Sequence, residues 1–271
     1  MSIIETTPAP VPQVIAAPAT VHRNIPMGRI VTTELRKMFD TRSGFWLLAS
    51  IGLLGFIATA AVIAFSSDTG LTYNTFATAV GYPMTVILPI IAILSVTSEW
   101  SQRSGLTTFT LVPHRGRVIT AKALASVGVA VATVPLALAL GALGNLVGTR
   151  IAGVEPVWDL TLMNMATILL GNVLGLGVGF MLGVLVRSSS GALVGYFVYS
   201  FLLPTLAVIL ASSQAWFRHL QPWVDFKFAA GSLVDGTVTA QQWANLGVTS
   251  VIWLLIPMIV GLALVSRAEV K

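Results

Sequence analysis

The sequence predicts an all-α integral membrane protein with six transmembrane helices and with both termini in the cytoplasm. Of its 271 residues, 55% are hydrophobic and 9% are charged, and its mean hydropathy is +0.87. A soluble domain carries about 25% charged residues, and a soluble fold of this length could not bury so much apolar surface. Six long apolar stretches and a one-sided distribution of Lys and Arg are the other two observations that indicate a multi-pass membrane protein.

The chain begins with a tail and a helix that precede the first apolar stretch. Residues 1–24 are rich in Pro, Ala and Thr and contain no basic stretch followed by an apolar run, so we expect a disordered cytoplasmic tail and no secretory signal. Residues 25–44 are predicted to form an amphipathic interface helix that ends at Ser43 and Gly44. Its predicted apolar side contains Ile30 or Val31, Leu35, Met38 and Phe39, and its polar side contains Arg29, Thr32, Thr33, Arg36, Lys37 and Asp40.

The predicted transmembrane domain covers residues 45–271. A helix needs about 20 mainly apolar residues to cross the hydrocarbon layer. The chain has six such stretches, at about 45–65, 73–97, 118–147, 160–186, 191–211 and 245–265. None of them contains Asp, Glu, Arg or His, and Lys122, near the start of the third, is their only lysine.

The basic residues between the spans predict the orientation of the chain. An even number of spans places both termini on one side, and twelve of the fifteen Lys and Arg residues belong to that side. They are Arg23, Arg29, Arg36, Lys37, Arg42, Arg103, Arg115, Arg117, Lys122, Arg187, Arg267 and Lys271. The other side has only Arg150, Arg218 and Lys227. Because basic residues concentrate on the cytoplasmic side, we expect both termini there.

Two connections between the spans are long enough to hold structure of their own. Residues 98–117 are predicted to form a short cytoplasmic helix that Pro113 ends, followed by a basic turn. Residues 212–244 contain Trp216, Trp223 and Trp243. Because tryptophan favours the membrane interface, we expect interfacial or re-entrant helices before the sixth span.

Small residues and prolines within the spans indicate close packing and kinks. Gly171, Gly175, Gly179 and Gly183 share one face of the fourth span, and packing within the same subunit is favoured over a seam between two subunits. The prolines within spans are Pro83, Pro89, Pro135, Pro204 and Pro257. Each removes a backbone hydrogen bond and favours a kink, which suits a protein that opens and closes but also occurs in static helices.

The sequence contains no motif of an enzyme. No lysine follows a glycine, so the phosphate-binding loop G-x-x-x-x-G-K-[ST] is absent, and any ATP and Mg²⁺ would be bound by a partner chain. There is no cysteine, and the three histidines lie far apart, so we expect no metal or other cofactor in this chain. The net charge of +5 is explained by membrane orientation, and we expect no nucleic-acid partner.

The loop between the second and third spans has a distinctive set of residues. They are Glu99, Trp100, Gly105, Leu106, Thr107, Leu111, Pro113, Arg115, Arg117, Ala121 and Lys122. This pattern resembles the first cytoplasmic loop of ABC-2-type transporter permeases, the membrane subunits of ABC exporters with the type V fold. The upstream sequence ELRKMFDTRSGFW is similar to the N-terminal interface helix of that family. The resemblance extends from about Met27 to the C-terminus, although Leu106 stands where the family more often has Thr.

The resemblance implies a permease subunit of the plasma membrane that exports an amphipathic or hydrophobic substrate, such as a lipid, a peptide or a drug-like molecule. Two copies of a separate ATPase subunit would dock beneath a permease homodimer or heterodimer, and the loop would act as the coupling helix. The residues implied to contact the ATPase or transmit its motion are Glu34, Arg36, Lys37, Glu99, Arg103, Pro113, Arg115 and Arg117.

Several alternatives remain open at this stage. The arginines of the loop could serve only orientation and binding of anionic membrane lipids, whereas Glu99 is not explained by orientation. The substrate cavity is assigned to Tyr82, Asn172, Tyr196, Phe197 and Phe201, although such side chains more often pack against helices or lipid. The chain could instead be a non-transporting scaffold or sensor that binds a partner through residues 98–117. A membrane-embedded enzyme is disfavoured because no acid–base cluster occurs in the sequence.

Overall fold

The computed structural model of the protein describes residues 25–101, 115–234 and 237–267. It is 88% helical, and no β-strand occurs within these ranges. The predicted tail 1–24 and the predicted short helix between the second and third spans fall outside the described residues, the latter because it lies mainly in 102–114. The elements are α1 (Met27–Asp40), α2 (Arg42–Phe65), η1 (Asp68–Gly70), α3 (Tyr73–Ser101), α5 (Arg115–Ala152), α6 (Leu162–Val186), α7 (Ser189–Phe197), η2 (Val198–Leu202), α8 (Leu203–Ser213), α9 (Ala215–Val224), α10 (Phe226–Gly231), α11 (Ala240–Ser250), η3 (Val251–Leu255) and α12 (Ile256–Arg267).

Six helical segments of the described chain are long and apolar enough to cross a membrane, as predicted. They are Arg42–Phe65, Tyr73–Ser98, Gly116–Ala152, Leu162–Val186, Ser189–Ser213 and Ala240–Val265. The largest differences from the predicted boundaries are at the end of the third segment and at the start of the sixth. The third continues to Ala152 because the helix ends only at Gly153, whose φ is +72°. The sixth begins at Ala240 because Thr239 and Gln242 form a capping box there.

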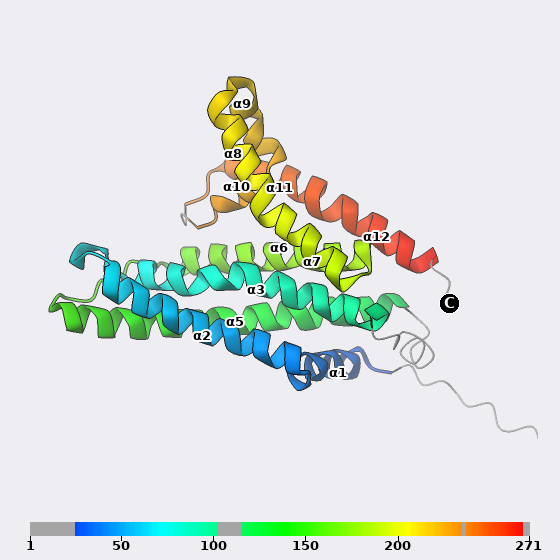
Figure 1. The fold of residues 1–271 in the computed structure, drawn as a ribbon, viewed down its shortest axis with the longest axis horizontal. Coiled ribbons are helices and arrows are strands. Elements are labelled where there is room, and N and C mark those ends of the chain that lie inside the picture. The colour runs from blue at the N-terminus through cyan, green and yellow to red at the C-terminus, as the bar shows by residue number, and fades with distance from the viewer. Residues whose placement is uncertain (1–24, 102–114, 235–236, 268–271) are drawn as a thin grey trace, which may run out of the picture.

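The core of the molecule lies among α2, α3, α5 and α6, which run along its long axis (Figure 1). Helix α3 is central and contacts the other three. Its buried residues Val80, Met84 and Leu88 pack with Val129 of α5 and Phe180 of α6. Because α3 is enclosed by neighbours, half of its most apolar window is buried in the single chain (50%).

The glycine face of α6 packs against α3 within the same chain, as the sequence favoured. A Cβ atom at Gly179 would lie 2.4 Å from the carbonyl oxygen of Pro89, and one at Gly183 would lie 3.2 Å from the Cβ of Val96. The face is not uniform, since a Cβ atom at Gly175 would meet no heavy atom within 4 Å. Gly179 therefore determines how closely the two helices approach.

The amphipathic helix α1 ends at Asp40, a few residues before the predicted end. Thr41 separates it from α2, and the Oγ1 of Thr41 accepts a hydrogen bond from the N–H of Gly44 at 3.2 Å. A Cβ atom at Gly44 would lie 1.9 Å from the carbonyl oxygen of Met38. The turn between α1 and α2 thus needs glycine at position 44, although the helix break itself is at Thr41.

The fifth and sixth spans lean away from the four central helices (Figure 1). The fifth consists of α7, η2 and α8, and the sixth of α11, η3 and α12. Between them lie two short helices, α9 and α10, in the region where the sequence predicted interfacial or re-entrant helices; their position relative to a membrane stays a prediction. Together with α8 and α11 they form a compact group that rises from one side of the bundle, above α6 at the top of the view (Figure 1).

Candidate functional site

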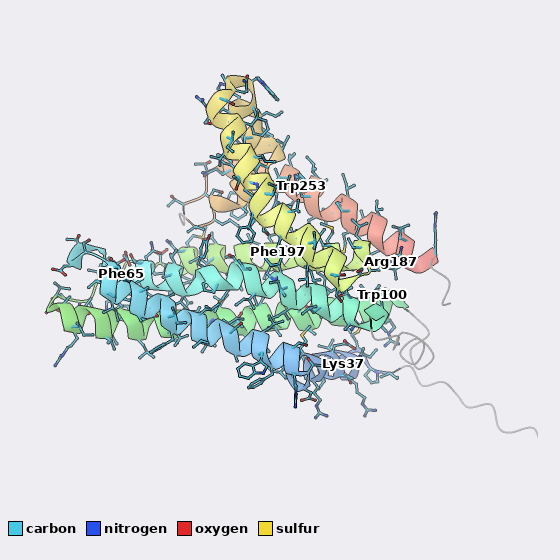
Figure 2. The ribbon with its side chains drawn as sticks, viewed as in Figure 1. Lys37, Phe65, Trp100, Arg187, Phe197 and Trp253 are labelled. Atoms are coloured by element: carbon cyan, nitrogen blue, oxygen red, sulfur yellow. The ribbon has the colours of Figure 1, made fainter. Side chains whose placement is uncertain are left out.

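The candidate site lies where α1 meets α5 and the C-terminal part of α3. Figure 2 shows Lys37 of α1 and Trp100 of α3 at this end of the molecule, with Phe65 at the opposite end. Helix α1 buries Ile30, Glu34 and Met38, which follow one another at intervals of four residues on one face. A glutamate therefore occupies the middle of the face that α1 presents to the bundle.

Both carboxylate oxygens of Glu34 are engaged by lysines. The Nζ of Lys122, on α5, lies 2.5 Å from Glu34 Oε2 and also donates to the carbonyl oxygen of Ser95, on α3, at 2.9 Å. The Nζ of Lys37 lies 2.7 Å from Glu34 Oε1. Only 5% of the Glu34 side chain and 3% of the Lys122 side chain are exposed, against 46% for Lys37. The buried pair thus ties α1 to α5, and Lys122 extends the contact to α3.

The two lysines keep the buried carboxylate ionised. Burial by itself raises the pKa of Glu34, because it disfavours the charged form. The charges of Lys122 and Lys37 and their hydrogen bonds outweigh that effect, so the net pKa of Glu34 lies below its ordinary value. Glu34 is therefore a charged residue at neutral pH, and its partners must remain in place to keep it so.

The ion pair lies close to the two helix ends that border the segment 102–114. Ser95 precedes Ser101, the last residue of α3, by six positions, and Lys122 follows Arg115, the first residue of α5, by seven. Each distance along the chain is about two helical turns. A displacement of either helix end would therefore act directly on the residues that hold α1.

Of the residues assigned to the ATPase interface, the structure brings Glu34 and Lys37 together. Arg36 is exposed on the outer side of α1, and the guanidinium of Arg117 donates to the carbonyl oxygen of Ile25 at 2.5 Å. Arg103 and Pro113 lie outside the described residues, as do the side chains of Glu99 and Arg115. Glu34 faces α5 and the solvent does not reach it, so its place in the structure is that of a link between helices.

The five residues assigned to a substrate cavity differ widely in their exposure in the single chain. Tyr82 is 69% exposed, whereas Tyr196 is buried and its hydroxyl donates to the carbonyl oxygen of Thr85 at 2.8 Å. Asn172 is buried in α6, and its amide donates to the Ile168 carbonyl oxygen of the same helix. The remaining two, Phe197 and Phe201, are exposed and stack on each other with ring centroids 6.0 Å apart.

Sequence reasoning missed Lys122 as a member of the site, although two signals indicated it. Lys122 is the only charged residue in the six predicted spans, and Glu34 stands at helical spacing between Ile30 and Met38. A second polar contact joins the same end of α3 to α7, where the hydroxyls of Thr97 and Ser189 lie 2.8 Å apart. In the part of the chain that the structure describes, no group of three or more His, Asp or Glu residues is arranged to hold a metal ion.

A scan of the chain against protein-family models finds no match, and neither does a search of the curated proteins.

Proposed function

We propose that the chain is the membrane permease subunit of an ATP-driven exporter. A separate ATPase subunit, present in two copies, would supply the energy, and a second permease subunit would complete the pathway. The substrate would be amphipathic or hydrophobic, because the six apolar spans contain almost no charge that could bind an ion or a polar solute. The chain itself would bind neither ATP nor Mg²⁺ and would reside in the plasma membrane with both termini in the cytoplasm.

One observation carries this proposal. The buried Glu34–Lys122 pair joins α1 to the helix that follows the segment 102–114, and Lys122 also holds α3, the helix that precedes it. A subunit that pushed on this segment from the cytoplasm would therefore move α1, α3 and α5 together. This mechanical connection, at the end of the bundle that carries most Lys and Arg, is what a chain driven by an external ATPase requires.

The sequence resemblance supports the proposal independently. The residues of the loop 98–117 resemble the coupling loop of ABC-2-type permeases, and the sequence of α1 is similar to the interface helix of the same family. In this function Arg36, Arg115 and Arg117 would contact the ATPase, together with Glu99 and Arg103. Glu34 would act through Lys122, as a residue that positions α1.

The test is co-expression with an ATPase subunit encoded beside this chain, followed by purification and reconstitution in proteoliposomes. We expect the two chains to co-purify and the complex to hydrolyse ATP. Glu99→Ala, or Arg115→Gln together with Arg117→Gln, is expected to reduce that hydrolysis, whereas Arg150→Gln at the opposite end of α5 serves as the matched control. If no ATPase co-purifies, a scaffold or sensor that binds another partner through residues 98–117 becomes the better interpretation. If the loop variants hydrolyse ATP as the reference complex does, the loop is not the coupling element.

A further inference from the structure

The fifth and sixth spans each contain one π-helical turn. These turns are η2 and η3, and each has five residues. At the end of η2 the N–H of Leu203 donates to the carbonyl oxygen of Val198, and at the end of η3 the N–H of Ile256 donates to that of Val251. Both bonds span five residues in place of the usual four. Such turns are rare, and they frequently occur at functional sites within helices.

A proline follows each π-helical turn at the same position. Pro204 and Pro257 are the second residues after η2 and η3. Proline has no N–H and its ring collides with the carbonyl group four residues earlier, which here belongs to Ser200 and Trp253, the third residues of the two turns. The wider turn relieves that collision. Pro135, by contrast, lies within the uninterrupted helix α5, so proline alone does not produce a π-helical turn in this fold.

The two π-helical turns contact each other. The rings of Tyr199 in η2 and Trp253 in η3 have their centroids 5.7 Å apart. The indole Nε1 of Trp253 also donates to the carbonyl oxygen of Val224, at the end of α9, at 2.6 Å. A change of angle at one turn is therefore passed to the other turn and to α9.

The part of each span on one side of its π-helical turn is attached to the central helices. Helix α7 is held on α3 by the Tyr196 hydroxyl, which donates to the Thr85 carbonyl oxygen, and by the contact of Thr97 with Ser189. Helix α12 lies close against α6, because a Cβ atom at Gly261 would be 3.2 Å from the backbone nitrogen of Leu185.

On the other side of both turns lie α8, α9, α10 and α11, described at residues 203–234 and 237–250; we call this group the cap. Its helices pack on one another. Through the apolar side chains of Phe226, Ala229 and Leu233 the cap rests on α6.

The hydroxyl of Tyr199, beside this contact, is buried and has no hydrogen-bond partner among the described residues. Burying a polar group without a partner is unfavourable, so a position of the cap that admits water to this hydroxyl would recover part of that free energy.

We propose that the cap moves as one body, pivoting on η2 and η3, and lifts from α6 while α7 and α12 stay in place. The two turns can bend because neither has the full set of α-helical hydrogen bonds, and the contact of Tyr199 with Trp253 makes them bend together. Among the described residues, the surface that separates is apolar and no hydrogen bond or ion pair crosses it. This motion does not depend on the exporter function, and it can be tested on the purified chain.

Cysteine labelling of the full chain in lipid nanodiscs tests the motion directly, since the sequence has no cysteine of its own. Leu233→Cys places a thiol in the contact between the cap and α6, where only 1% of Leu233 is exposed. Ala77→Cys is the buried control on α3, with 6% of Ala77 exposed, and Ala244→Cys is the exposed control on the cap. We expect the thiol at position 233 to react with N-ethylmaleimide more slowly than that at 244 but at least about tenfold faster than that at 77, because it becomes accessible when the cap lifts.

Replacing the two prolines tests the location of the pivots. Pro204→Ala with Pro257→Ala restores an N–H donor to each span, so bending must then break a hydrogen bond. We expect about tenfold slower labelling at position 233 and unchanged labelling at position 244. Labelling at position 233 that is as slow as at 77, or that the proline replacements leave unchanged, would overturn the proposal.

A disulfide provides a second test that leaves the prolines in place. A Cβ atom at Gly171 would lie 4.0 Å from the Cβ of Leu233, within the range that a disulfide spans. In the Gly171→Cys, Leu233→Cys protein we expect oxidation to slow hydrogen exchange at η2 and η3 about tenfold, and reduction to restore it. The single Gly171→Cys protein, which cannot close the disulfide within the chain, is the control. Equal exchange at both turns in the oxidised and reduced forms would show that the cap does not pivot there.

Discussion

Glu34 of α1 and Lys122 of α5 form a buried ion pair between two residues 88 positions apart in the chain, with their charged atoms 2.5 Å apart. The pair is nearly inaccessible to solvent on both sides. It fixes the amphipathic helix to the membrane-spanning bundle, together with the apolar contacts of Met38 and the hydrogen bond from Arg117 to the Ile25 carbonyl oxygen. A buried charge depends on its partner, so this contact constrains both helices more strongly than an exposed ion pair would.

Removing one member of the pair is expected to destabilise the protein strongly. Lys122→Met leaves the Glu34 carboxylate buried with only the half-exposed Lys37 beside it, and a buried charge without its partner costs about 3–5 kcal/mol. The double variant Glu34→Leu, Lys122→Met removes both charges and is expected to recover most of that loss. Thermal unfolding of the purified proteins measures both effects.

The matched control is Lys37→Met, which removes the other lysine of the same carboxylate. Because nearly half of the Lys37 side chain is exposed, its loss is expected to cost at most about 1 kcal/mol. The prediction is contradicted if the double variant Glu34→Leu, Lys122→Met is as unstable as Lys122→Met alone. In that case the stability would depend on one of the two side chains and not on the ion pair.

The same pair gives the protein a defined dependence on pH. In the unfolded chain Glu34 titrates near its ordinary pKa of 4.5, and in the folded chain its pKa is lower. The stability that comes from ionised Glu34 is therefore fully present above pH 4.5, and it is lost as the pH falls below 4.5 through the folded pKa. The melting temperature should decline more steeply on acidification in the reference protein than in Glu34→Gln, whose side chain does not titrate. Parallel pH profiles for the two proteins would show that Glu34 carries no such contribution.

The spans were predictable from the sequence, and the ion pair was not. Apolar stretches are a local property of the chain, so six of them can be counted without knowing what they pack against. The partner of Glu34, in contrast, is decided by how α1 lies against α5. On α1 the sequence left open whether Ile30 or Val31 is the core position, and it placed Phe39 on the apolar side. In the structure Ile30 and Met38 are buried with Glu34 between them, and Phe39 is 53% exposed.

The prolines illustrate a second limit of sequence reasoning. The same residue type lies in uninterrupted α-helix at Pro89 and Pro135, and beside a π-helical turn at Pro204 and Pro257. Neighbouring helices enclose α3 and α5 on several sides, whereas the fifth and sixth spans bury only 6% and 17% of their most apolar windows. Packing by distant residues thus decides how a helix accommodates its proline, and sequence spacing does not show that packing.

Two glycines of α6 are expected to respond differently to the same substitution. Gly179→Ala would place a methyl group 2.4 Å from the carbonyl oxygen of Pro89, so α3 and α6 must move apart, at a cost of about 1–3 kcal/mol. Gly175→Ala, one helical turn away, would meet no heavy atom within 4 Å and is expected to leave the protein unchanged or to stabilise it by up to about 1 kcal/mol. The two melting temperatures make the comparison, and similar values for both variants would contradict the close approach at Gly179.

The two tyrosines assigned to a substrate cavity, Tyr82 and Tyr196, are also expected to differ in how much their substitution lowers stability. The Tyr196 hydroxyl donates to the Thr85 carbonyl oxygen, so Tyr196→Phe removes one buried hydrogen bond between α7 and α3 and is expected to cost about 1 kcal/mol. Tyr82→Phe removes a hydroxyl from a side chain that is 69% exposed and is expected to change stability by less than about 0.5 kcal/mol. Thermal unfolding in detergent distinguishes the two. If only Tyr196→Phe lowers the stability, Tyr196 serves to attach the fifth span to α3. Among the aromatic residues assigned to the substrate cavity, the exposed Tyr82, Phe197 and Phe201 would then remain as candidates for substrate contact. No loss at Tyr196 would mean that the hydrogen bond to Thr85 does not hold α7 in place.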